Sequence, residues 1–132
     1  MSTLRTNALE GVDAKNSITI VAGAGNVNTT NVQQGLVKQW KQFDAGDSNA
    51  IRDSFNTASI TDEGTGEFMV VLTNNMANSS YCVHVTGSTN MSGCIDSDTV
   101  ATSQYGTEYD EDSNGNPADP NNGMSSASGD LA

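Results

Sequence analysis

With 132 residues, the chain has room for one domain of ordinary size. Only 35% of the residues are apolar, so a folded core must be thin or be completed by neighbouring subunits, and we expect an oligomer. The 16 acidic and 5 basic residues give a formal net charge of −11, which opposes contact with phosphate backbones, and we therefore expect no nucleic-acid partner.

The first part of the chain predicts one short strand. Residues 1–14 are mixed and polar, without a positively charged leader followed by an apolar run, so we expect neither secretion by that route nor membrane insertion. Residues 17–22 form a β-branched run that ends at Gly23 and Gly25. Because this pair lacks the third glycine and the following helix of a phosphate-binding loop, it indicates a turn.

Two periodicities compete in residues 32–43. Leu36, Trp40 and Phe43 match helical spacing, whereas Gly35 and the shortness of the run oppose a helix. The pattern alone leaves helix and strand open for this segment.

Further along, the pattern predicts antiparallel strands joined by turns. Phe68, Val70 and Leu72 alternate with other apolar side chains in residues 67–73, so both faces of this strand are apolar and we expect it to be central. Short polar segments separate it from its neighbours. The strands expected in this part of the chain cover residues 50–55, 67–73 and 81–86.

Beyond residue 87 the composition shifts to Ser, Thr, Asn, Asp and Gly, which cannot build a core alone. We predict short strands within residues 95–105 and 124–128. Between them we predict an acidic loop at about residues 106–123, which contains both prolines and a cluster of acids.

The sharpest motif lies in this acidic loop. Asp110, Asp112, Asn114 and Asn116 place oxygen side chains at alternating positions, and Gly115 occupies the sixth place of a calcium-loop pattern. An asparagine stands at the closing position, where a bidentate glutamate is expected. A weak calcium site and a solvated acidic loop both stay open, and we expect no other cofactor.

Cys82 and His84 lie two residues apart and share one strand face, and Cys94 could approach them, an arrangement that suggests zinc. A fourth ligand is missing from any familiar spacing. We therefore expect free, buried thiols, with a Cys82–Cys94 disulfide as the alternative.

Catalysis is poorly supported by the residue types. The single histidine has no nucleophile signature beside it, and a chain of this length leaves little room for the groove of a glycan-cleaving carboxylate pair. We expect no enzymatic activity.

Four blocks, residues 38–44, 51–56, 59–68 and 73–81, follow one another in a recognisable order and spacing. Together they resemble a module of tail-fibre and other virion structural proteins of bacteriophages, especially marine phages and cyanophages. Residues 2–20 are similar to the leader that precedes this module. The last four residues are similar to the usual chain end of such proteins.

This resemblance implies a virion protein of antiparallel strands, often assembled as a homotrimer, and it favours a strand at residues 37–43. We predict an all-β chain, with a small antiparallel β-sandwich or barrel-like domain at residues 31–132. Residues 1–30 are predicted to be an extended N-terminal segment for attachment and oligomerisation. The predicted core consists of Trp40, Phe55, Phe68, Val70, Leu72 and Tyr81.

The expected function is that of a capsid-associated short fibre, knob or decoration protein, made in the host cytoplasm and located in the virion. The absence of a long shaft favours this over a tail-fibre subunit that mediates host adsorption. A free glycan-binding module is the third alternative, which the polar surface and Tyr81, Tyr105 and Tyr109 permit. The expected partners are further copies in a homotrimer, capsid or tail proteins, and a host surface glycan or receptor.

Overall fold

The computed structural model describes residues 19–22, 28–32 and 35–132. The chain divides into two compact units, residues 1–36 and 37–132. In the first unit, β1 (Thr19–Ala22) pairs antiparallel with β2 (Asn28–Asn31). Most of the predicted attachment segment lies outside the described residues, and its role stays a prediction.

The second unit is built from strands and one short 3-10 helix, η1 (Ala45–Asp47). No helix in the described ranges is long and apolar enough to span a membrane. The strands are β3 (Val37–Asp44), β4 (Ala50–Phe55), β5 (Thr57–Gly64), β6 (Glu67–Leu72), β7 (Cys82–Thr86), β8 (Met91–Ala101), β9 (Gln104–Glu111) and β10 (Gly123–Ser128).

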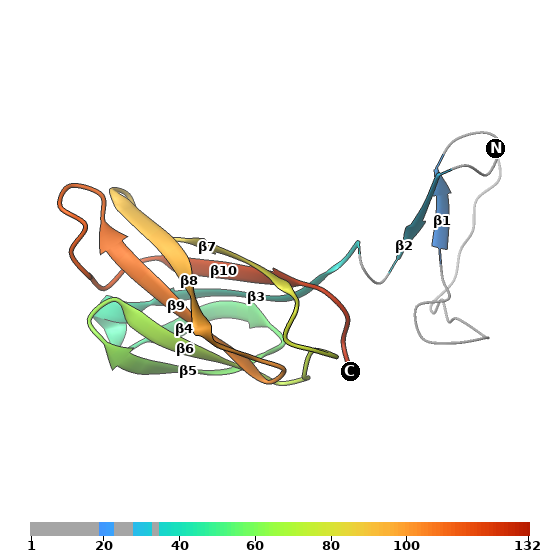
Figure 1. Cartoon of the computed structure of the whole chain (residues 1–132). Helices are drawn as coiled ribbons and strands as arrows, with labels where there is room; N and C mark the ends of the chain where they lie inside the picture. Colours follow the sequence, from blue (N-terminus) through green and yellow to red (C-terminus); the bar gives the residue numbers. More distant parts are fainter. Residues whose placement is uncertain (1–18, 23–27, 33–34) are drawn as a thin grey trace. The chain divides into compact units, whose positions relative to one another are not determined.

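These strands form two antiparallel four-stranded sheets, which pack face to face and do not close into a barrel (Figure 1). The first, which we name the β3 sheet, has the order β4-β3-β10-β7. The second, the β6 sheet, has the order β5-β6-β9-β8. The predicted all-β, antiparallel class is confirmed, and the sandwich arrangement holds rather than the barrel-like one.

A single residue, Asn56, joins the edge strand of one sheet to the edge strand of the other. Asn56 adopts a left-handed φ of 57°, which asparagine tolerates better than most residues. Its side-chain nitrogen Nδ2 donates to the carbonyl of Lys38 at 3.0 Å, and its side-chain oxygen accepts from the backbone nitrogen of Asn74 at 2.6 Å. Three of the four sequence blocks therefore meet at this corner.

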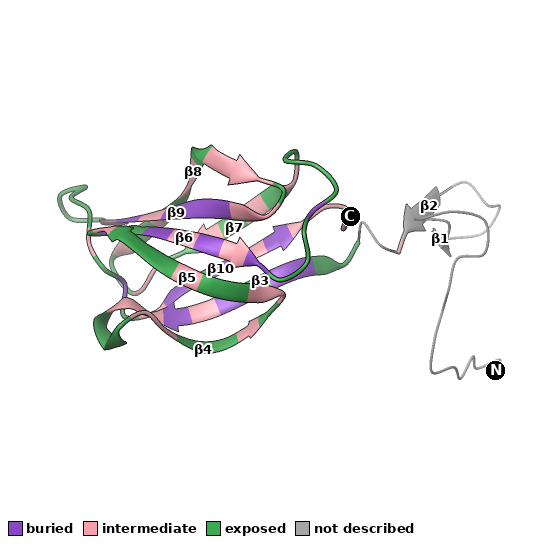
Figure 2. Cartoon of the chain, turned by 90° about the horizontal axis from the view of Figure 1, so that it is seen from below, coloured by how far each residue is buried: buried purple, intermediate pink, exposed green. Residues whose placement is uncertain are grey.

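The core lies between the facing sides of the two sheets, where β3, β6, β9 and β10 carry most of the buried residues (Figure 2). Inward side chains alternate with outward ones along each strand. Phe43 and Phe68 meet edge to face, with ring centroids 4.9 Å apart. One cluster contains Phe43, Phe68 and Tyr109, and the other contains Val70, Leu72, Met76, Tyr105 and Ala127.

The predicted core position of Trp40 and Phe55 is wrong. On β3 the buried residues Gln39, Lys41 and Phe43 point inward, so Trp40 points outward and is 39% exposed. Phe55 lies directly opposite Trp40 on β4 and is 52% exposed. The size and aromaticity of a side chain do not determine which face of its strand is turned inward, and here Phe43 takes the inward place.

Tyr81 lies at the margin of the core, where it packs against the cluster of Val70 and Tyr105. Its hydroxyl is 2.9 Å from the carbonyl of Ala101 and 2.8 Å from that of Gln104. Burial raises the pKa of Tyr81 to about 12. The side chain thus fastens the start of β7 to the turn between β8 and β9.

The predicted acidic loop is also wrong in its first part. Residues 104–111 form β9, an inner strand of the β6 sheet, in which Tyr105, Thr107 and Tyr109 are buried. Glu108 and Asp110 alternate with these buried residues and face outward. Period-two alternation thus outweighs the acidic composition of this segment.

Candidate functional site

The four predicted calcium ligands do not share one environment. Asp110 belongs to β9, whereas Asp112, Asn114 and Asn116 lie in the chain reversal that follows. The Asn114 side-chain oxygen accepts from the backbone nitrogen of Asn116 at 2.8 Å, and Asp112 accepts from the Ser92 hydroxyl. Among the described residues, no three acidic, histidine or cysteine side chains are grouped as metal ligands. Calcium binding stays a prediction.

Both cysteines are free and exposed, so their expected burial is wrong. They lie on β7 and β8, the adjacent edge strands of different sheets, and both point outward. The Cys82 sulfur is 3.6 Å from Nε2 of His84, and the Cys94 thiol donates to Glu108 at 3.6 Å. Desolvation and the contact with Glu108 raise the pKa of Cys94. The three residues that suggested zinc are not gathered in one site.

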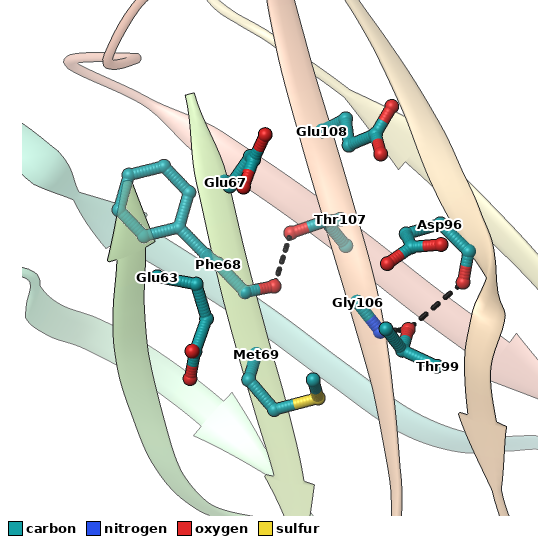
Figure 3. A pocket seen from close by; sticks show the side chains of 9 residues that line it. All are labelled: Glu63, Glu67, Phe68, Met69, Asp96, Thr99, Gly106, Thr107 and Glu108. Carbon is teal, nitrogen blue, oxygen red and sulfur yellow. Dashed lines mark hydrogen bonds between the residues drawn. The ribbon is translucent and has the colours of Figure 1, made fainter. Parts of the chain in front are cut away.

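The outer side of the β6 sheet carries a cluster of carboxylates, and we name it the acidic face. Its carboxylates surround a hollow of about 240 Å³ (Figure 3). Glu67 and Glu108 are direct cross-strand partners, so two like charges face each other. The acidic side chains lining this hollow are Glu63, Glu67, Asp96 and Glu108.

Gly106 shapes the floor of the acidic face. The Thr99 hydroxyl accepts from the backbone nitrogen of Gly106 at 2.6 Å and donates to the carbonyl of Asp96 at 2.8 Å (Figure 3). A Cβ on Gly106 would lie 2.5 Å from the Thr99 oxygen. The pairing of β8 with β9 is irregular between Asp96 and Ala101, which includes Thr99. Thr99 can approach β9 this closely because residue 106 is a glycine.

The outer side of the β3 sheet is different, and we name it the Trp40 face. The strand registers align its side chains in two rows that cross all four strands. In antiparallel sheets, directly opposed residues point to the same side. One row is Phe55, Trp40, Ser126 and His84, and the next is Asp53, Gln42, Met124 and Thr86.

A hollow of about 270 Å³ lies on this face beside Trp40. Met124, 37% exposed, adds a second apolar wall. The Gln42 amide donates to the side-chain oxygen of Asn122 at 2.7 Å, which holds one end of the Gln42 side chain in place. The residues that line the hollow are Trp40, Lys41, Gln42, His84, Thr86, Met124, Ser125 and Ser126.

Sequence reasoning missed the lysine that lies inside the sandwich. Lys41 is 2% exposed, and its Nζ lies 3.8 Å from the ring centroid of Phe43 and donates to the Tyr109 hydroxyl at 3.4 Å. Desolvation lowers the pKa of Lys41 to about 7. The available signal was its position, two residues before Phe43 on the same strand face. Its amine faces the core rings, so we assign it to folding rather than to a site.

A network of hydrogen bonds beside Lys41 provides partners for two further buried polar side chains, Gln39 and Ser125. The Tyr105 hydroxyl is 2.6 Å from Oε1 of Gln39 and 2.7 Å from the Ser125 hydroxyl. Gln39 also donates to the Thr57 hydroxyl at 2.9 Å. Burial raises the pKa of Tyr105, and the same holds for Tyr109. Tyr105 and Tyr109 therefore do not supply the exposed aromatic surface that a glycan-binding module requires.

The Trp40 face has the chemistry of a binding surface. It combines an exposed aromatic ring and a thioether with amide, imidazole and hydroxyl groups. Comparisons with protein-family models, curated proteins and solved structures find no match for this chain.

Proposed function

We propose that the protein is a structural component of a bacteriophage particle, displayed as a capsid-associated short fibre, knob or decoration protein. The observation that carries this proposal is that the phage-like blocks describe one coherent substructure. Residues 38–44 form β3, residues 51–56 supply β4 and the Asn56 corner, and residues 59–68 run through the β5–β6 hairpin. Residues 73–81 meet that corner at Asn74.

The sandwich is suited to display outside a particle. Its two apolar clusters are both formed by residues of the unit 37–132. A net charge of −11 keeps densely displayed copies soluble and discourages attachment to one another through the acidic face. In this proposal the N-terminal segment supplies attachment to the particle and assembly into a homotrimer.

The Trp40 face favours a second candidate, a tail-fibre subunit that mediates host adsorption. Trp40, Phe55 and Met124 are exposed on one side of one sheet, and such apolar surface on a soluble protein commonly marks an interaction site. A capsid decoration protein needs attachment, but it needs no exposed aromatic face. The position of the protein on the particle decides between the two candidates.

Immunogold labelling of intact particles, with an antibody raised against the sandwich, tests the proposal. Label over the icosahedral shell supports a capsid fibre or decoration protein, and label on the tail supports the adsorption subunit. Unlabelled particles that also lack peptides of this chain in mass spectrometry contradict the virion assignment. Light scattering of the full-length chain tests the trimer separately, since a monomer would contradict only the oligomeric state.

A further inference from the structure

Trp40 lies at a position where the fold does not require an indole. Its strand neighbours Gln39 and Lys41 face the core, while Trp40 lies on the outer side and is 39% exposed. An outward Trp contributes no burial between the sheets and leaves apolar surface in water. The backbone that carries the ring is nevertheless held on both sides, because β3 is an inner strand of its sheet. The half-exposed ring therefore offers an apolar platform on an ordered strand.

The side chains around the ring alternate between apolar and hydrogen-bonding groups. Trp40 is opposite Ser126 in the register, and Met124 lies between Gln42 and Thr86. The lining thus offers amide, imidazole and hydroxyl groups that can both donate and accept hydrogen bonds. A matching ligand presents an apolar surface to the indole and several hydroxyl groups at its edge.

Charge and size limit the ligand further. None of the described residues that line this hollow is acidic, although the chain contains 16 acids and the acidic face gathers four of them. A charged cation would be drawn to the acidic face instead, and an anion would be repelled by the net charge of −11. The volume of about 270 Å³ lies below the roughly 300–1,000 Å³ that is usual for drug-sized ligands, which favours a ligand of one ring.

We infer that the hollow beside Trp40 binds a single neutral sugar ring of a glycan, with one face of the pyranose stacked on the indole and its hydroxyls bonded to Gln42, His84, Thr86 and Ser126. A second copy of the chain fits this surface less well. Stable protein interfaces bury about 1,200–2,000 Å² with an apolar centre, whereas here the diagonal neighbours Trp40 and Met124 are each directly opposite a polar side chain, Ser126 and Gln42. The inference names a ligand class for the Trp40 face, which the second candidate function uses for host adsorption, and it is tested on the isolated protein.

The chain contains one tryptophan, so its fluorescence reports on this hollow directly. Full-length protein is titrated with the neutral sugars glucose, galactose, mannose and N-acetylglucosamine and with their short oligomers. We expect a saturable change in Trp40 emission for at least one of them, with a Kd on the order of 1 mM for a single ring. Polyanionic alginate should bind more weakly than the best neutral sugar, because of the net charge.

Variants test whether the sugar binds in the hollow beside Trp40 or elsewhere on the surface. Thr86→Val removes one hydroxyl at nearly constant shape and keeps the reporter, and it should weaken binding about threefold. Trp40→Ala should weaken binding at least about tenfold, as measured by amide chemical shifts in NMR. Ser59→Ala, on exposed β5 of the other sheet, is the matched control and should leave binding unchanged. Melting temperatures establish that each variant is folded.

Three outcomes would overturn the inference. The first is that no neutral probe gives a saturable change, and the second is that binding survives Trp40→Ala. The third is a shift of Trp40 emission with protein concentration alone, which would assign the face to contact between copies. None of these results affects immunogold labelling, so failure of the sugar site and failure of the virion assignment remain distinguishable.

Discussion

The two outer faces of the sandwich both belong to antiparallel four-stranded sheets, but they differ in chemistry. On the β3 sheet, outward positions hold Trp40 and Met124, whereas on the β6 sheet they hold Glu67 and Glu108. The core constrains only the inward positions of each strand, so the outward positions are free to differ. Acids on one face provide solubility, while an indole on the other face leaves apolar surface in water without strengthening the core. We therefore assign binding to the Trp40 face.

The largest expected effect is the loss of stability when a core ring is removed, compared with the loss when the ring of the Trp40 face is removed. Phe68→Ala should lower the free energy of unfolding by about 3–5 kcal/mol, because it removes a fully packed ring from between the sheets. Trp40→Ala should lower it by less than about 1 kcal/mol, because that ring is outside. Urea unfolding measures both. Equal losses in the two variants would place Trp40 in the core and remove the distinction between faces.

Replacing the buried lysine should stabilise the protein. Lys41→Met keeps the length and apolar stem of the side chain and removes the cost of desolvating an ammonium group. We expect a gain of about 2–4 kcal/mol in the free energy of unfolding near pH 6. A loss of stability at this pH would mean that the contacts with Phe43 and Tyr109 outweigh desolvation.

The pH dependence of this gain follows from the lowered pKa of Lys41. Its pKa falls from 10.5 to about 7 in the folded state, so the unfolded chain binds more protons between these values. The free energy of unfolding of the wild type should therefore rise with pH from about 7 to about 10.5. The advantage of Lys41→Met should shrink over the same range, and an advantage independent of pH would contradict the buried-amine assignment.

A smaller effect tests the repulsion on the acidic face. Glu67→Lys turns a pair of like charges into an opposite pair with Glu108, and it should stabilise by about 0.5–1 kcal/mol at low salt. Glu63→Lys, which has no direct partner in the strand register, is the control and should gain less. Urea unfolding at low and at 1 M salt checks the cause, because an equal gain at high salt would exclude a Coulomb effect.

The smallest expected effect concerns Cys94 at the edge of the acidic face. Its raised pKa has partial desolvation as the main cause and contact with Glu108 as the next. Glu108→Gln should therefore increase the thiolate fraction and speed alkylation of Cys94 by iodoacetamide at pH 8 by about two- to fivefold. Peptide mass spectrometry follows the reaction, with Cys82 as the internal control. An unchanged rate at Cys94 would exclude Glu108 as a cause.

The positions of β4, β6 and β7 were accessible to sequence reasoning, but β9 was not, and neither was the facing of the side chains. Alternation in residues 67–73 predicts β6, and the runs at residues 50–55 and 81–86 predict β4 and β7. Both sides of β3 carry large or amphipathic side chains. Residue type suggests that Trp40 is buried and Lys41 is exposed, but in the structure Lys41 is buried and Trp40 is exposed. A lysine stem can pack like an apolar chain, which hides a buried lysine from composition.

From the sequence, alternation and turn residues predicted antiparallel strands in residues 50–86, and the residue counts gave the strongly acidic charge, because these are local or additive properties. The all-β class of the whole chain followed only with the help of the resemblance, which favoured a strand at residues 37–43. The tertiary structure decided that β9 and β10 are inner strands and that Trp40 faces outward. Both depend on pairing between distant segments, since β3 lies between β4 and β10 and its inward side is set by the sheet packed against it. A one-residue change of register would reverse every side chain of such a strand.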